Sequence, residues 1–121
     1  MKQIIFIGLI LLGLSSCTDK ELLETIYKEQ GYAVGKITAS TSVMYVITYY
    51  YEYQVGATTY KGKKEGGVSN TSDSRMIGRR FLVVYKRSDP KISDLNFKYP
   101  VDTEQDFFDL LERFKNKPPT P

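Results

Sequence analysis

Between Val43 and Val55 the chain carries a pattern that leaves it few choices of fold. β-Branched and aromatic side chains fill this stretch, and five of the ten tyrosines lie between Tyr45 and Tyr53. Successive side chains of a strand point to opposite faces, so the odd-numbered positions share one face. Tyr50 lies on the other, more polar face. The stretch therefore predicts a strand that places most of its aromatic rings on one side of a sheet.

A glycine after this strand predicts a hairpin. Gly56-Ala57 suits a two-residue type II′ turn, which requires glycine at its first central position. The resulting register sets Tyr53 opposite Tyr60 and leaves Gly62 opposite Tyr51. We predict that the tyrosine face is buried, because a chain without tryptophan needs these rings to build a core. The alternative is that the rings form a ligand-binding platform.

Two more strands and two helices complete the predicted fold. Ala33–Thr38 is a weaker strand candidate, and Arg80–Lys86 is apolar on both faces, which indicates an interior strand. A short helix is expected up to about Gln30, and residues 65–78 are expected to form a loop. The C-terminal helix, capped by Asp102 or Thr103, carries an apolar stripe of Phe107, Leu110, Leu111 and Phe114. The predicted class is α+β: a small antiparallel sheet of about four strands, with a short N-terminal helix and the C-terminal helix packed on the sheet.

The N-terminus has the layout of an export signal. Met1-Lys2 supplies positive charge, Ile4–Leu14 contains only Ile, Phe, Gly and Leu, and small residues lead to Cys17. A permanent spanning helix needs about 20 apolar residues. This run is shorter, so we expect it to be removed.

Leu14-Ser15-Ser16-Cys17 resembles the lipobox of bacterial lipoprotein precursors. The resemblance implies cleavage before Cys17 and a diacylglycerol on its thiol, so that the mature protein is tethered to a membrane. The expected organisation is a signal peptide at 1–16, a lipid-anchored linker with a short helix at 17–30, one α+β domain at 31–117 and a proline-rich tail at 118–121. The expected location is the cell envelope, anchored in the outer membrane and facing the periplasm or the surface. The alternative for a lone cysteine is a buried core thiol.

A second resemblance rests on strand and turn residues. Its motifs are Tyr51-x-Tyr53-x-Val55, Tyr60-x-Gly62, Val83-Val84-Tyr85, Pro90 and Ser93-x-Leu95. Together they are similar to a widespread uncharacterised β-rich domain of bacterial envelope proteins. This resemblance implies a fold and an envelope setting, and the family carries no established activity.

The composition disfavours several kinds of chemistry. The chain has no histidine and one cysteine, so the commonest general base, the commonest zinc ligand and cysteine-based nucleophiles are missing. We expect no catalytic residues, no metal and no cofactor. Lys61–Arg87 holds eight basic against two acidic side chains. This segment is interpreted as a solvated face, with a patch for lipid phosphates or an acidic partner as the alternative.

The leading functional hypothesis is a non-catalytic envelope lipoprotein that binds another protein. It would act as an accessory subunit of an envelope assembly or as an inhibitor of an incoming toxin. Nucleic acid is not an expected partner, because the charge is close to balanced and an export signal is present. The alternative is a small-ligand or glycan binder that uses exposed Tyr50 and the loop around Asn70.

Overall fold

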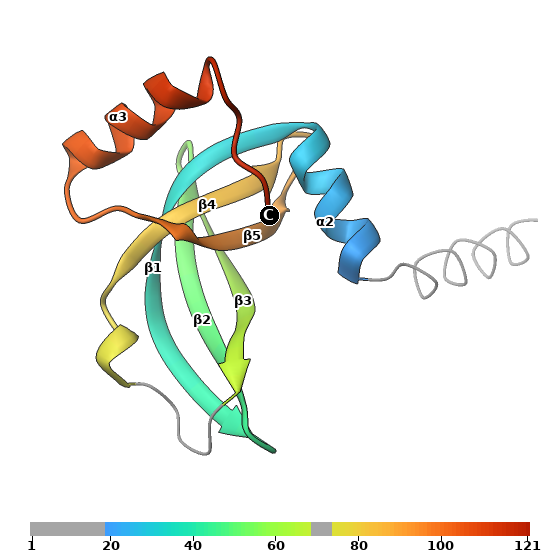
Figure 1. The fold of residues 1–121 in the computed structure, drawn as a ribbon, viewed down its shortest axis with the longest axis vertical. Coiled ribbons are helices and arrows are strands. Elements are labelled where there is room, and N and C mark those ends of the chain that lie inside the picture. Colours follow the sequence, from blue (N-terminus) through green and yellow to red (C-terminus); the bar gives the residue numbers. More distant parts are fainter. Residues whose placement is uncertain (1–18, 69–73) are drawn as a thin grey trace, which may run out of the picture.

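The computed structural model describes residues 19–68 and 74–121 of the chain, which form one antiparallel sheet and two helices (Figure 1). The elements in chain order are α2 (Asp19–Lys28), β1 (Gln30–Val43), β2 (Val46–Val55), β3 (Thr58–Val68), the short 3-10 helix η1 (Ser74–Met76), β4 (Arg80–Lys86), β5 (Asp89–Pro100) and α3 (Glu104–Phe114). The α+β class, with helices near the N-terminal side and at the C-terminus, is confirmed.

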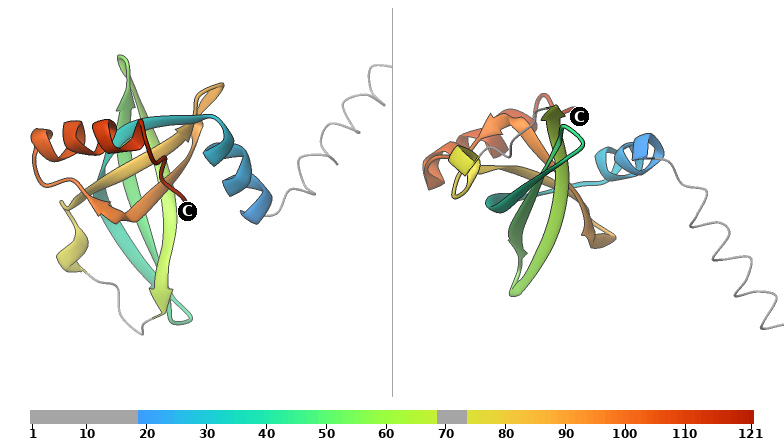
Figure 2. Two further views of the ribbon diagram at one scale, coloured as in Figure 1. Left: turned by 45° about the horizontal axis from the view of Figure 1, so that its top comes forward. Right: turned by 90° about the horizontal axis from the view of Figure 1, so that it is seen from below.

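The sheet has the strand order β3-β2-β1-β4-β5, and every neighbouring pair is antiparallel. It curls so strongly that its edge strands β3 and β5 come into contact (Figures 1 and 2). In the described part of the chain these two strands share no backbone ladder. The result is a half-barrel with an inner aromatic face and an outer face partly covered by the helices.

The predicted β2–β3 hairpin is confirmed residue by residue. Tyr53 lies opposite Tyr60, and Tyr51 lies opposite Gly62. Gly56 has a positive φ of 62°, and Ala57 does not share it. That combination is the one a type II′ turn requires.

Three boundaries differ from the prediction. The strand expected from Val43 begins at Val46, because Met44-Tyr45 forms the turn between β1 and β2. β1 runs well beyond the predicted Ala33–Thr38, and β3 continues into the predicted loop. Local sequence did not reveal these extensions, because they depend on pairing with a neighbouring strand rather than on residue preference.

The sheet also has five strands rather than about four. No strand was predicted between Lys86 and the C-terminal helix, yet Asp89–Pro100 forms the edge strand β5 against β4. Its polar residues Ser93, Asp94 and Asn96 and its two prolines hide the strand pattern. Prolines are tolerated here because they stand at the two ends of an edge strand.

The tyrosine face is the core of the half-barrel, as predicted. Tyr49, Tyr51 and Tyr53 are buried, and they pack among Ala33, Ile37, Ile47, Phe81, Val83 and Leu95. Gly62 makes room for one of these rings, since a Cβ built there would lie 2.4 Å from Cζ of Tyr51. The prediction that this face is buried is therefore confirmed for β2. Tyr45 is an exception, because it belongs to the turn and is exposed.

A second core lies on the outer face, between the sheet and the helices. Its buried members are Ile26, Leu82, Val84, Val101, Leu110 and Phe114. Thr103 is the N-cap of α3: its hydroxyl accepts a hydrogen bond from the backbone N–H of Asp106, whose carboxylate accepts one from the Thr103 N–H. This reciprocal capping box fixes where the helix starts. The cap is thus one of the two predicted residues, and of the predicted stripe Leu110 and Phe114 are buried in this core, with Phe107 packed against it.

The proline-rich tail lies against the folded chain. Pro119 is fully buried, and its carbonyl accepts a hydrogen bond from Gln30 at 3.1 Å. Asn96 donates to the carbonyl of Thr120 at 3.0 Å, and the Lys98 ammonium donates to that of Pro121 at 2.8 Å. These bonds pin the C-terminus over β5, where Figure 1 marks it.

Candidate functional site

The turn between β1 and β2 carries the most exposed apolar surface of the described residues. Val43 is 67% exposed, Met44 88% and Tyr45 62%. The turn lies at the lower end of the long axis in Figure 1, away from both helices. We call these three residues the apolar tip.

The backbone of the apolar tip is in an unfavourable conformation for its residues. Met44 and Tyr45 have positive φ angles of 51° and 70°. Two such residues in a two-residue loop make a type I′ turn, for which Asn-Gly is the preferred pair. A residue with a Cβ costs about 1 kcal/mol or more in this region. The domain therefore keeps two large apolar side chains at a position where asparagine and glycine would be more stable.

The parts of β1 and β2 that lead to the apolar tip are uncharged. From Ile37 to Tyr51 the chain has no Asp, Glu, Lys or Arg, although charged residues make up 26% of the sequence. Proteins usually protect exposed edge strands with charges, especially lysine, and the ladder between β1 and β4 reaches only to Lys36. From Ile37 to Tyr51 the polar side chains of β1, the turn and β2 are those of serine, threonine and tyrosine.

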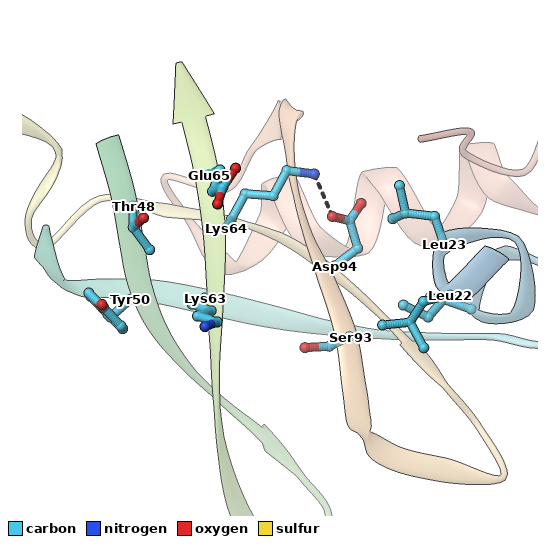
Figure 3. A pocket seen from close by; sticks show the side chains of 10 residues that line it. Leu22, Leu23, Thr48, Tyr50, Lys63, Lys64, Glu65, Ser93 and Asp94 are labelled. Carbon is cyan, nitrogen blue, oxygen red and sulfur yellow. Dashed lines mark hydrogen bonds and ion pairs between the residues drawn. The ribbon is translucent and has the colours of Figure 1, made fainter. Parts of the chain in front are cut away.

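A groove on the outer face is the second candidate site, and we call it the α2–β3 groove (Figure 3). Its volume is about 330 Å³. Leu22, Leu23 and Ile26 of α2 form an apolar side. The other lining residues are Thr48 and Tyr50 of β2, Lys63, Lys64 and Glu65 of β3, and Ser93 and Asp94 of β5.

An ion pair across the seam between the edge strands lies between the β3 side and the α2 side of the groove. The Lys64 ammonium lies 2.5 Å from Oδ1 of Asp94, which is only 4% exposed (Figure 3). Oδ2 of Asp94 accepts a hydrogen bond from the hydroxyl of Tyr27 at 2.7 Å, and that hydroxyl accepts one from Asn96 at 3.0 Å. Burial, with the neighbouring carboxylate of Asp94, raises the pKa of Tyr27 above its ordinary value. The network thus joins α2, β3 and β5.

Two tyrosine hydroxyls from the inner face also reach β5. Tyr51 shares a hydrogen bond with the Ser93 hydroxyl at 2.7 Å, and Tyr53 donates to the carbonyl of Pro90 at 2.5 Å. Burial raises the pKa of both tyrosines. Together with the Lys64–Asp94 pair of β3 and β5, these bonds from β2 hold β5 against the other side of the half-barrel through side chains rather than through a backbone ladder.

Of the residues singled out in the sequence, Tyr50 lies in the α2–β3 groove and is 38% exposed. It faces away from the aromatic core, as the alternation predicted. Asn70, Cys17 and the lipobox residues Leu14, Ser15 and Ser16 lie outside the described residues, as does the expected signal peptide. The apolar tip was not among these residues, although the absence of charged residues between Ile37 and Tyr51 is a signal for it.

Four of the basic residues between Lys61 and Arg87 contact different groups of the protein. Lys61 lies 3.8 Å from the Glu52 carboxylate, and Lys64 is paired with Asp94. Arg79 stacks on the ring of Phe81 at 5.0 Å, and Arg80 donates to the carbonyl of Asp102 at 2.5 Å. These four cations thus contact groups of their own fold, and the interpretation of the whole segment as a solvated face stays a prediction.

Comparisons with protein-family models, with curated protein sequences and with solved structures give no match. Within residues 19–68 and 74–121, neither helix is long and apolar enough to cross a membrane. The same residues contain no group of three or more acidic or cysteine side chains placed to hold a metal ion. The two family resemblances of the sequence therefore remain predictions.

Proposed function

We propose that this protein is a membrane-tethered, non-catalytic binding module of the cell envelope that inserts its apolar tip into another protein. The tether is the lipid expected on Cys17. The observation that carries the proposal is the combination of exposure and backbone strain at Met44 and Tyr45. Strained residues persist where function requires them, because a more stable sequence is otherwise easily reached.

A protein partner explains the chemistry of the tip better than a bilayer does. Methionine and tyrosine are both enriched in the buried centres of protein interfaces, and tyrosine is a frequent hot-spot residue. Segments that bind a membrane surface usually combine apolar residues with lysine or arginine. β1, the turn and β2 contain no lysine and no arginine between Ile37 and Tyr51. The partner should therefore offer an uncharged, apolar pocket.

The position of the tip agrees with this role. α2 leads back toward the expected anchor, and it lies beside the upper part of the sheet, whereas the tip lies at the opposite end of the long axis (Figure 1). A module held through α2 can therefore present the tip to a neighbouring protein. Accessory subunits and toxin inhibitors of the envelope both need such a presented contact.

The proposal predicts that one double substitution separates stability from function. Met44→Asn with Tyr45→Gly relieves the strained turn and should raise the free energy of unfolding by about 1–2 kcal/mol. The same change removes the two side chains expected to fill the partner's pocket, so partner retention should be lost. Urea denaturation measures stability, and an envelope extract passed over the immobilised protein measures retention.

The β2–β3 hairpin provides the matched control. Ala57→Ser changes an exposed residue at another turn, and it should leave retention unchanged. A photo-crosslinking residue at position 44 should capture the same partner, and one at position 57 should not. If the Asn-Gly variant retained the partner as the native chain does, the tip would not be the contact.

A further inference from the structure

The α2–β3 groove has two sides of different chemistry, and this difference restricts what it can bind. Leu22 and Leu23 give an apolar side, whereas Lys63, Glu65 and Thr48 give a polar one (Figure 3). Tyr50 adds an exposed aromatic ring. A volume of about 330 Å³ is at the lower end of the range for small-molecule sites. The groove therefore suits a compact ligand with one apolar and one hydroxyl-rich part.

The charges in the groove cancel, which disfavours a strongly charged ligand. Lys64 and Asp94 neutralise each other across the seam. Lys63 and Glu65 are then left two positions apart on the outer face of β3, with Tyr50 and Thr48 as their partners across the ladder. An anion in the groove would be repelled by Glu65, and a cation would be repelled by Lys63. A neutral molecule that both donates and accepts hydrogen bonds can use both residues.

From this arrangement we propose that the α2–β3 groove binds a short N-acetylated glycan. The hydroxyls of the sugar bridge Lys63, Glu65 and Thr48, and its C–H face stacks on the ring of Tyr50. The acetyl methyl group lies against Leu22 and Leu23, where it is removed from water. This site lies on the outer face of the sheet, so the inference goes beyond the proposed protein contact and does not depend on it.

The acetyl group makes the inference testable with two β-1,4-linked disaccharides that differ in their acetamido groups. Di-N-acetylchitobiose and cellobiose are added separately to the full chain, purified in detergent, and the amide signals are followed by NMR. Di-N-acetylchitobiose should saturate shifts at Tyr50, Lys63 and Glu65 and along α2. Cellobiose lacks the acetamido groups and should bind at least roughly 10-fold more weakly, as expected for the loss of an apolar group from its pocket.

Substitutions then locate the site. Tyr50→Ala and Leu22→Ser both change exposed residues of the groove, and each should weaken di-N-acetylchitobiose binding at least roughly 10-fold. Tyr45→Ala is the matched control, because it removes an exposed tyrosine from the apolar tip instead. It should leave sugar binding intact while reducing partner retention. Failure of the sugar-binding proposal can therefore be distinguished from failure of the proposed protein contact.

Three outcomes would overturn the inference. They are the absence of saturable shifts in the groove with di-N-acetylchitobiose, equal binding of cellobiose, and unchanged binding by both groove variants. A well-dispersed NMR spectrum is required of each variant as proof that it is folded, so that lost binding is not confused with lost structure.

Discussion

At the scale of single residues, the aromatic core depends on glycines that leave space for rings. Gly62 lies directly across the ladder from Tyr51, and a Cβ there would lie 2.4 Å from Cζ and 2.5 Å from the hydroxyl oxygen of that ring. Such distances are far inside van der Waals contact. The ring is fully buried and its hydroxyl is held by Ser93, so it has little freedom to move away.

This close fit predicts that Gly62→Ala lowers the stability of the protein, whereas strand propensity alone predicts that it raises it. Replacing a strand glycine with alanine is ordinarily favourable by about 0.5–1 kcal/mol. Overpacking a core costs about 1–3 kcal/mol. Gly62→Ala should therefore destabilise the protein, which a shift of the urea midpoint to lower concentration would show. Thr59→Ala, an exposed change on the same strand, serves as the control, and an unshifted midpoint for Gly62→Ala would contradict the argument.

At the scale of elements, the half-barrel is closed by side chains instead of backbone pairing. Lys64 and Asp94 join β3 to β5, and Tyr27 ties α2 to the same carboxylate. A buried charge that loses its partner is costly, whereas exposed ion pairs contribute little. The seam should thus be sensitive to the loss of one particular lysine.

Two lysines on β3 allow this idea to be tested. Lys64→Met leaves the buried Asp94 with only the Tyr27 donor among the described contacts, and should cost about 1–3 kcal/mol in the free energy of unfolding. Lys61→Met removes an exposed ammonium that lies 3.8 Å from Glu52, and should change stability by at most about 0.5 kcal/mol. Adding Asp94→Leu to Lys64→Met should recover part of the loss. Equal effects of the two lysine changes in urea denaturation would show that the seam pair is not structural.

At the scale of the whole molecule, burial of tyrosine makes stability depend on alkaline pH. Burial raises the pKa values of Tyr27, Tyr32, Tyr51 and Tyr53 above the ordinary value of 10.0. A raised folded-state pKa contributes stability that is fully present below the unfolded pKa and is lost as pH rises through the folded one. These four groups therefore do not destabilise the protein at neutral pH, and they favour unfolding above about pH 10.

The expected result is an unfolding free energy that falls steeply above about pH 10, by about 1.4 kcal/mol per pH unit for each tyrosine that is ionised only when unfolded. Circular dichroism follows unfolding, and ultraviolet absorbance follows the formation of tyrosinate. Tyr51→Phe removes one of the four groups, so its free energy should fall less steeply with pH, whatever its stability at neutral pH. A slope equal to that of the native chain would show that Tyr51 ionises as readily in the fold as outside it.

Sequence patterns that extend over a few residues were sufficient to predict the β2–β3 hairpin and α3. Side-chain alternation placed Tyr51 and Tyr53 in the core and Tyr50 outside it, Gly56 set the turn, and Thr103 set the helix start. Each of these depends on residues close together in the sequence. The expected lipid on Cys17 is equally local, and it lies outside the described residues.

Only the tertiary structure decided the rest, because those features depend on partners far away in the chain. β5 is a strand because β4 pairs with it, despite its polar residues. Met44-Tyr45 became a turn because β1 and β2 pair up to their ends, which no local preference of methionine or tyrosine indicated. The α2–β3 groove exists because the sheet curls until Lys64 meets Asp94, thirty positions later. Alternation and turn chemistry act over a few residues, whereas curvature and the closing of the seam follow from packing the whole aromatic core.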